Sequence, residues 1–485
     1  MKAVIRTRSI SESGSGFLLL LLFAFILIFN DLWLPGLPSY DDCAKAQRGW
    51  EMLQSGDIAT PQLAGKPNFD HPPFYLWTLA LSFGIFGKTE FAARFPGAVM
   101  AFLSVWIIYL IGTKIKNRNT GWWAGFFLIT SYMFLKLSRR VQTDIPFMLF
   151  TALALLYFLK ALEDSDKKSS PGILRRDFIL WGFFTGIAGL IKSVFIIFPL
   201  LAPFICIIVL GRKSRRLLAP YLLGLLVAGF TAGWWYLFEF IKYGGFFITS
   251  FMDSFVGGHI SGMSNLGRFG FAGYLYEFLR HFWLWLPLTV WCLYIAVKRK
   301  SFAKNARLSA LMIHIVFPLI MLSFFGDKTI RYVMFLFIPL LVITAFICDD
   351  VMAKKLNRSF IIAALVFLTA VSAYVVARPA DLAGRPNYDY SILREMIEKG
   401  KLDPAGKDFY HFEEDFGQNR LPLLFYTGFD LKGVIYNEEE LNALVKREQG
   451  FFLLIRKERM TDYLKSEFRI AGTLEKRLLL MPIEK

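Results

Sequence analysis

The chain has 485 residues, a formal net charge of +17, and a composition that is 55% hydrophobic and 17% aromatic. With a mean hydropathy of +0.46, a protein of this length has too few polar residues to cover its surface in water. The composition therefore excludes a soluble globular protein and indicates a polytopic membrane protein. Membrane topology and attraction to anionic headgroups account for the positive charge, so no nucleic-acid partner is expected. The four cysteines have no paired spacing, and neither a disulfide framework nor a zinc site is expected.

Apolar runs long enough to cross a bilayer begin after a short basic N-terminus. The first, residues 17–34, could pass for a signal peptide, but no small-residue cleavage site follows it, and we predict a retained helix. Runs of about 17 to 25 residues predict further spans near residues 92–113, 120–137, 144–162, 178–192, 194–210, 217–241, 281–297, 307–325, 331–348 and 359–378. The fold class expected is an all-α polytopic membrane protein with about 11 to 13 transmembrane helices.

Lys and Arg residues predict the orientation of these spans. They gather in alternate loops, among them those that contain Lys114, Lys167, Arg215, Lys298 and Lys354. Because short cytoplasmic loops carry an excess of Lys and Arg, these loops are predicted to face the cytoplasm. The loop at residues 35–91 then lies on the outer side of the membrane, and an odd number of spans places the C-terminus there too.

The last part of the chain changes character. Residues 380–485 are rich in charged residues, and their apolar residues recur with both helical and strand spacing. This predicts a small soluble unit after a transmembrane region of residues 1–379. Apolar residues have helical spacing at 438–448, and a short apolar run of strand length follows at 450–455. A second helical segment at 460–466 is likewise followed by a short apolar run at 478–482. We predict a small extracytoplasmic α/β domain at the C-terminus.

The first outer loop is rich in acidic residues. Asp41 and Asp42 open a predicted amphipathic helix that lies along the membrane surface. Ser39 can act as its N-cap with Asp42 at the third position, and both acids favour the positive end of the helix. An acid at a helix end that faces a membrane cavity can also be the general base for a hydroxyl or amine acceptor. The two interpretations are compatible for neighbouring acids.

A second motif of the same loop is Asp70-His71-Pro72-Pro73. The prolines fix their own φ and keep His71 out of a helix, so the acid and the imidazole are presented in an extended turn that can hold a phosphate or a metal. The alternative is a loop that re-enters the bilayer, with Pro72 at the start of the next helix. Asp70 and His259 are the residues that could form part of a site for a divalent metal ion; the alternative is that His259 is simply solvated, as loop histidines usually are.

Further charged residues fall on the predicted outer face. They are Arg139, Arg140, Asp144, Lys192, Lys328 and Arg331. Lys192 interrupts an apolar run, and a lone intramembrane lysine is costly and usually functional, although snorkelling to the interface is the alternative. Several convergent cations on this face predict an anionic ligand, most simply a lipid phosphate.

With these motifs in order, the chain resembles the polyprenyl-phosphate-sugar-dependent glycosyltransferases of the GT-C fold. The likeness is strongest to the bacterial branch that includes the lipid A aminoarabinose transferases and related protein mannosyltransferases. The matching residues are Asp41-Asp42, the segments 51–57, 70–75 and 91–96, Asp144-Ile145-Pro146, Gly189-Leu190-Ile191-Lys192 and the segment 328–332. The resemblance covers most of residues 15–350.

The resemblance implies an inverting transfer of a sugar from a polyprenyl-phosphate carrier to an acceptor at the outer membrane face. The implied catalytic acids are Asp41, as base or acceptor-orienting group, and its neighbour Asp42. The implied phosphate-binding residues are Lys192, Lys328, Arg331, Arg139, Arg140 and His71, and the implied positioning residues are Asp144 and Arg94. Preplaced cations that stabilise the leaving phosphate suit the electrostatic demand of glycosyl transfer.

The partners implied are a polyprenyl-phosphate-linked sugar, a lipid or protein acceptor, and membrane lipids. The aminoarabinose transferases have an Asp-Glu pair and a Glu-Lys-Pro-Pro loop where this chain has Asp41-Asp42 and Asp70-His71-Pro72-Pro73, so the sugar and the acceptor are not implied. An envelope glycolipid such as lipid A is the first expectation and protein Ser/Thr hydroxyls the second. A lipid or sugar transporter is the alternative from another class; it would place its charges near the bilayer midplane.

Overall fold

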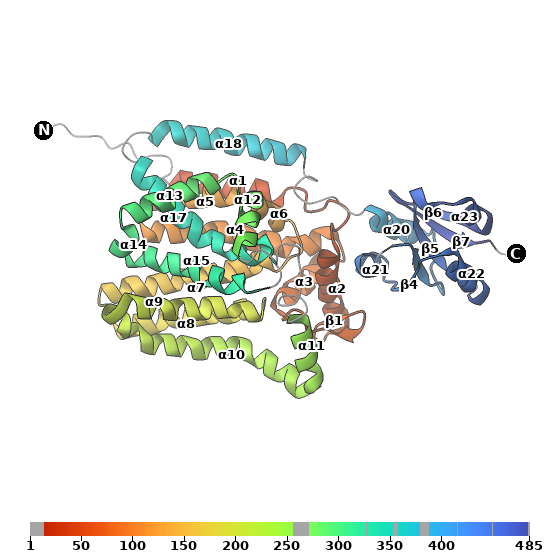
Figure 1. The fold of residues 1–485 in the computed structure, drawn as a ribbon, viewed down its shortest axis with the longest axis horizontal. Coiled ribbons are helices and arrows are strands. Elements are labelled where there is room, and N and C mark those ends of the chain that lie inside the picture. Colours follow the sequence, from red (N-terminus) through yellow and green to blue (C-terminus); the bar gives the residue numbers. More distant parts are fainter. Residues whose placement is uncertain are drawn as a thin grey trace.

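The structure is a computed structural model that describes residues 14–255, 271–325, 328–352, 357–378, 388–414, 416–448 and 450–483. A helical bundle occupies most of the chain, and a smaller α/β unit lies beside one end of it (Figure 1). His259 lies outside the described residues, and so does the predicted boundary at residues 379–380. The prediction that divides the chain at this boundary stays a prediction.

Long apolar helices form the bundle. They are α1 (Gly14–Phe29), α4 (Glu90–Ile115), α5 (Arg118–Ile129), α6 (Tyr132–Ser138), α7 (Asp144–Asp166), α8 (Pro171–Gly189), α9 (Ile197–Leu210), α10 (Leu218–Tyr243), α13 (Leu286–Lys298), α15 (Ala306–Ser323), α17 (Phe337–Met352) and α18 (Asn357–Ala377). In the part of the chain that the structure describes, 5 helices are long and apolar enough to cross a membrane, and shorter apolar helices accompany them. The number of membrane crossings stays a prediction.

Two predicted spans are divided in the structure. The run at 120–137 separates into α5 and α6 at Thr130 and Ser131, whose hydroxyls donate to the carbonyls of Phe126 and Phe127 at 2.6 and 2.7 Å. The run at 281–297 meets a break between α12 (Phe271–His281) and α13, which starts with a proline in its first turn.

The loop at 35–91 is more structured than the sequence predicts. It contains α2 (Tyr40–Ser55), the short hairpin of β1 (Gln62–Leu63) and β2 (Lys66–Pro67), and the apolar helix α3 (Phe74–Phe86). The Ser39 side chain accepts a hydrogen bond from the Asp42 backbone N–H, as an N-cap does. Helix α3 begins directly after Pro73, whose fixed φ suits the first turn of a helix.

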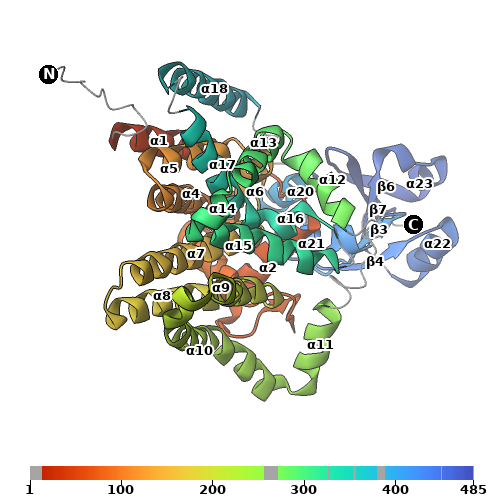
Figure 2. The ribbon, with the colours of Figure 1, turned by 60° about the vertical axis from the view of Figure 1, so that its left-hand side comes forward.

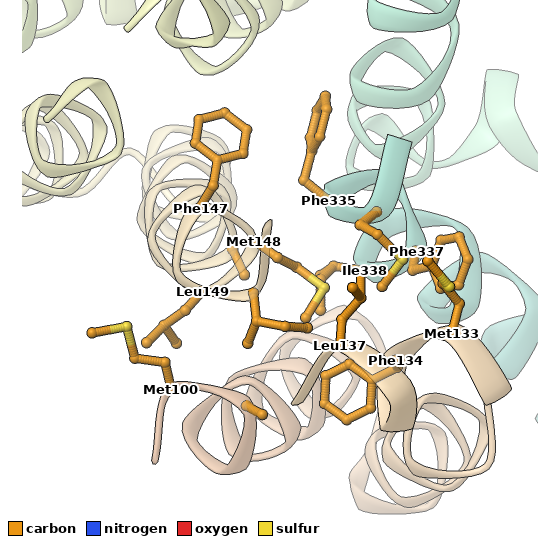
Figure 3. Packing of buried hydrophobic residues seen from close by; sticks show 14 of the residues in the cluster. Met100, Met133, Phe134, Leu137, Phe147, Met148, Leu149, Phe335, Phe337 and Ile338 are labelled. Carbon is orange, nitrogen blue, oxygen red and sulfur yellow. The ribbon is translucent and has the colours of Figure 1, made fainter. Parts of the chain in front are cut away.

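The core of the bundle lies between α4, α6, α7 and the segment 330–352. Figure 3 shows Phe147 of α7 facing Phe335, with Met148, Leu137 and Ile338 packed beside them. The rings of Phe147 and Phe335 meet edge to face, with centroids 5.4 Å apart. Elsewhere α8 and α10 approach closely at Gly182, where a Cβ would lie 2.1 Å from the Gly224 carbonyl oxygen. Only glycine allows this approach.

The C-terminal unit contains a five-stranded sheet in the order β4-β3-β5-β7-β6. Its elements are α20 (Tyr388–Glu398), β3 (Phe409–Phe412), α21 (Phe416–Thr427), β4 (Leu431–Ile435), α22 (Glu438–Arg447), β5 (Phe452–Arg456), α23 (Asp462–Glu467), β6 (Phe468–Thr473) and β7 (Arg477–Pro482). Strand β3 is parallel to β4 and β5, and β7 is antiparallel to β5 and β6. Helix α21 packs against α2 of the bundle, as Figures 1 and 2 both indicate.

Candidate active site

A cleft of about 850 Å³ lies at the end of the bundle that carries the C-terminal unit. Segments far apart in the sequence meet there: α2, the turn before α3, the start of α7, the segment after α8, helix α11 (Gly245–Phe255) and helix α16 (Ile330–Val333). Six of the residues singled out from the sequence line it. They are Asp41, Asp70, His71, Asp144, Lys192 and Arg331.

Asp41 stands beside Arg331 in this cleft. The Arg331 Nη1 donates to Asp41 Oδ2 at 2.9 Å and to Gln142 Oε1 at 3.3 Å. Burial alone would raise the pKa of Asp41, but the positive charges of Lys45 and Arg331 outweigh burial and lower the pKa of this carboxyl below its usual value. Asp41 is therefore ionised at neutral pH, as a hydrogen-bond acceptor for an incoming hydroxyl must be.

A second ion pair lines the same cleft. Asp144, the first residue of α7, accepts from the Lys192 ammonium at 2.6 Å. Lys192 follows α8, and its ammonium lies over the rings of Phe195 and Tyr332, 5.1 and 5.7 Å from their centroids. The carboxylate and the aromatic faces together hold this cation at the end of an apolar helix pair.

Asp70 is occupied by protein partners. It accepts from Arg48 at 2.6 Å and from Asn68 at 3.2 Å. Among the described residues no group of three or more His, Cys, Asp and Glu is arranged to hold a metal ion. Since His259 lies outside these residues, the metal site of Asp70 and His259 stays a prediction.

The structure places Asp42 and Arg140 beside the cleft rather than in its lining. Asp42 is fully buried, and its carboxylate accepts from Arg140 Nε at 3.0 Å and from the Val141 backbone N–H at 2.7 Å. Arg140 also donates to Ser39 Oγ at 2.6 Å. These bonds fasten the start of α2 to the segment before α7. Asp42 acts as a cap and anchor here, because its charge is satisfied by the protein.

Arg139 and Lys328 likewise are not among the residues that line the cleft. Arg139 is buried and donates to the Leu27 carbonyl at the end of α1. The Lys328 ammonium donates to the carbonyls of Leu322 and Ser323 at 3.3 and 3.0 Å. Each cation satisfies carbonyl groups at a helix C-terminus, where positive charge is favoured. Both residues thus have local backbone partners, and the predicted phosphate contacts stay predictions.

Arg94 has the arrangement expected of a loop-positioning residue. Its buried guanidinium, in α4, donates to the carbonyls of Leu32, Leu34 and Gly36. Three bonds to one short segment fix the path of the chain between α1 and α2. The position of Asp41 therefore depends on a residue outside the cleft.

The C-terminal unit braces the same segment from the other side. The Leu37 backbone N–H donates to the Tyr426 hydroxyl at 2.7 Å, and Arg394 pairs with Glu90 at 3.3 Å. Glu90 in turn accepts from the Gly36 backbone N–H at 3.1 Å. Helices α20 and α21 therefore contact the strip of chain that leads into α2.

The sequence did not single out three residues that line the cleft: Lys45, Gln142 and Tyr332. Lys45 is only 5% exposed. Burial, with help from the charges of Arg331 and Arg48, lowers its pKa to about 8, although Asp41 opposes the shift. Lys45 lies one helical turn after Asp41, and this spacing on a predicted helix was the available signal.

Comparison with known proteins agrees with this geometry. Residues 70–236 match a family described as dolichyl-phosphate-mannose-protein mannosyltransferase. An undecaprenyl phosphate-alpha-4-amino-4-deoxy-L-arabinose arabinosyl transferase of Pseudomonas savastanoi pv. phaseolicola is 33% identical over 30% of this chain and 28% of its own length. An uncharacterized protein of Aquifex aeolicus is 25% identical over 80% of this chain and 74% of its own.

The crystal structure of ArnT from Cupriavidus metallidurans bound to undecaprenyl phosphate superposes with a TM-score of 0.74, over 97% of this chain and 99% of that one. The chain has the GT-C fold. The two sequences are 16% identical, so this likeness defines the fold alone. Together the comparisons confirm the resemblance to GT-C glycosyltransferases of the aminoarabinose transferase type.

Proposed function

We propose that this protein transfers a sugar from an undecaprenyl- or other polyprenyl-phosphate donor to an acceptor of the bacterial envelope. The observation that carries the proposal is the cleft that sets the Asp41 carboxylate beside Arg331 and is also lined by Lys192. A glycosyl transfer needs these two features together: a base for the acceptor and preplaced cations for the leaving phosphate. The name of the arabinosyl transferase relative supports the choice of donor.

In this reaction an acceptor oxygen forms a bond to the anomeric carbon while the bond from that carbon to the phosphate oxygen breaks. The electron pair of the broken bond remains on the phosphate, where Arg331 and Lys192 stabilise the added charge. The proton of the acceptor hydroxyl passes to Asp41. A single displacement of this kind inverts the anomeric configuration. His71 lines the same cleft and can contact the phosphate.

The orientation proposed is an inner-membrane protein whose cleft and C-terminal unit face the periplasm. Helix α7 begins at Asp144 in the cleft and ends near Lys167, and α4 and α13 likewise run away from the cleft to Lys114 and Lys298. These basic residues therefore gather at the ends of the helices opposite the cleft. The Lys and Arg bias of short loops supports a cytoplasmic location for those ends.

An envelope glycolipid such as lipid A is the acceptor we favour, because the arabinosyl transferases are relatives by sequence and the ArnT structure covers nearly the whole chain. A protein hydroxyl is the second candidate, and the mannosyltransferase description of the family that matches residues 70–236 supports it. A lipid or sugar transporter would place its charges at the membrane midplane. Here Asp144, Lys192 and Arg331 lie at helix ends, which favours an enzyme.

Mass spectrometry of the cell envelope tests the function. Cells that lack this protein should accumulate a polyprenyl-phosphate-linked sugar and lose one sugar mass from a glycolipid or a glycoprotein. The wild-type gene should restore the modification, and the Asp41→Asn gene should not. An envelope and a lipid-linked sugar pool that do not change on deletion would contradict the proposal. The class of molecule that loses the sugar identifies the acceptor.

A further inference from the structure

The carboxylates that line the cleft are all engaged by cations. Asp41 pairs with Arg331 at 2.9 Å, Asp144 with Lys192 at 2.6 Å, and Asp70 with Arg48 at 2.6 Å. Three acids and three cations leave this set of ion pairs neutral. A further cation in the lining therefore has no carboxylate left for an ion pair of its own, although Asp41 still attracts it through space.

Lys45 is that further charge. Its side chain lines the cleft and is 5% exposed. The ammonium donates one long hydrogen bond, to the Asp41 backbone carbonyl at 3.5 Å, and no carboxylate of the described residues lies within 4.0 Å of it. An ammonium has three donors, so two of them have no protein acceptor among these residues.

Such an arrangement is costly in the free protein. A buried charge without an opposite charge destabilises the fold, and a lysine responds by a lowered pKa. Burial is the largest cause of the lowered pKa of Lys45, and the nearby guanidinium groups of Arg331 and Arg48 add to it. The cost falls when an anion enters the cleft and accepts the remaining hydrogen bonds.

We propose that Lys45 binds a phosphate oxygen of the polyprenyl-phosphate donor, as the cleft cation that no carboxylate of the described residues engages. The inference rests on the proposed function, since the donor supplies the phosphate. Lys192 and Arg331 each donate to a carboxylate as well as facing the ligand, whereas the Lys45 ammonium has no carboxylate within ion-pair distance among the described residues and keeps its donors for the ligand. Lys45 therefore contributes to affinity for the carrier as well as to stabilisation of the leaving group.

The general-base role is the alternative for a buried lysine of this kind. A neutral amine can take a proton from an acceptor, but an arginine cannot, since its guanidinium stays charged. Lys45→Arg therefore separates the two roles. If charge alone matters, the arginine retains carrier binding; if Lys45 is a base, Lys45→Arg fails in transfer as fully as Lys45→Met.

The test measures binding of undecaprenyl phosphate to the purified full-length protein in nanodiscs. Lys45→Met should weaken binding at least about tenfold, in keeping with the loss of a charged hydrogen bond, while Lys45→Arg stays within about threefold of wild type. Lys66→Met is the matched control, since Lys66 is an exposed lysine of the same loop outside the cleft. It should bind as wild type does.

Thermal stability provides a second measurement. If Lys45 had only a structural role, Lys45→Met would lower the apparent Tm. Removal of an unbalanced buried charge should leave the apparent Tm of Lys45→Met equal to or above that of wild type. Wild-type affinity in a folded Lys45→Met protein would overturn the inference. So would equal loss of binding in Lys45→Arg and Lys45→Met. A wild-type protein that does not bind undecaprenyl phosphate would instead contradict the proposed donor.

Discussion

Arg331 donates to the Asp41 carboxylate at 2.9 Å across a sequence separation of 290 residues. This bond joins the first helix after α1 to the short helix that precedes α17. It brings the base and the phosphate-stabilising cation of the proposed reaction into direct contact. The carboxylate is thereby oriented, and the positive charges of Lys45 and Arg331 keep it ionised.

Asp41→Asn should abolish sugar transfer and leave the carrier bound. The amide oxygen can still accept from Arg331, but the amide cannot take a proton, so the transfer rate should fall by about 10² or more. Transfer rates and undecaprenyl phosphate affinity of the purified variant measure the two effects. Asp462→Asn is the control, because the Asp462 side chain is 98% exposed and remote from the cleft in the C-terminal unit. Full transfer activity in Asp41→Asn would remove Asp41 from its role.

Asp42→Ala should lower the stability of the folded protein. The substitution leaves Arg140 without its carboxylate and the Val141 N–H without an acceptor. A broken buried ion pair costs roughly 3 to 5 kcal/mol, so the apparent Tm in detergent should fall clearly below that of Asp41→Asn. If the Asp42 variant keeps the wild-type Tm and loses only transfer, Asp42 is a catalytic acid and the anchoring role is wrong.

Affinity for undecaprenyl phosphate should decrease as the pH rises through about 8. The pKa of Lys45 is about 8, so the ammonium that contacts the phosphate loses its proton above that value. Among the charged groups near it, Asp41 and Asp42 have lowered pKa values and Arg331 a raised pKa, so these three keep their charges in this range. Binding isotherms from pH ~7 to ~9.5 give the profile. Lys45→Arg should bind equally well across the range, and a parallel decline in that variant would assign the titration to another group.

Tyr426→Phe tests the brace between the C-terminal unit and the bundle. The change removes the acceptor of the buried Leu37 N–H, which costs about 1 to 3 kcal/mol locally. Hydrogen exchange of the segment that leads into α2 should accelerate, and transfer should slow because Asp41 is held less firmly. Tyr436→Phe alters an exposed tyrosine of the same unit and should have no effect. Unchanged exchange at residues 36–42 in Tyr426→Phe would show that the contact does not hold this segment.

The sequence was informative where a charge interrupts an apolar run. Lys192 and Arg331 stand out for that reason, and both line the cleft. The sequence could not show that adjacent cations have different partners. Arg139 and Arg140 are consecutive, yet Arg139 donates to the end of α1 and Arg140 to Asp42. The direction of a side chain depends on packing that only the folded chain supplies.

Lys45 escaped notice for a related reason. Its helix has the pattern of a surface helix, yet Lys45 is buried in a cleft that distant segments of the chain form together. Helix α3 has 13 residues, which is shorter than a membrane span and gave no signal of its own. The strand order of the C-terminal sheet, with a crossover between β4 and β3, likewise depends on contacts between distant segments.

Transfer in a purified system tests the central claim most directly. The lipid-linked sugar extracted from cells that lack this protein is incubated with the purified enzyme and envelope glycolipid, and both products are followed by mass spectrometry. The wild-type protein should release free polyprenyl phosphate and add one sugar to the acceptor, and Asp41→Asn should be slower by about 10² or more. No transfer by the folded wild-type protein, or equal transfer by both proteins, would contradict the account.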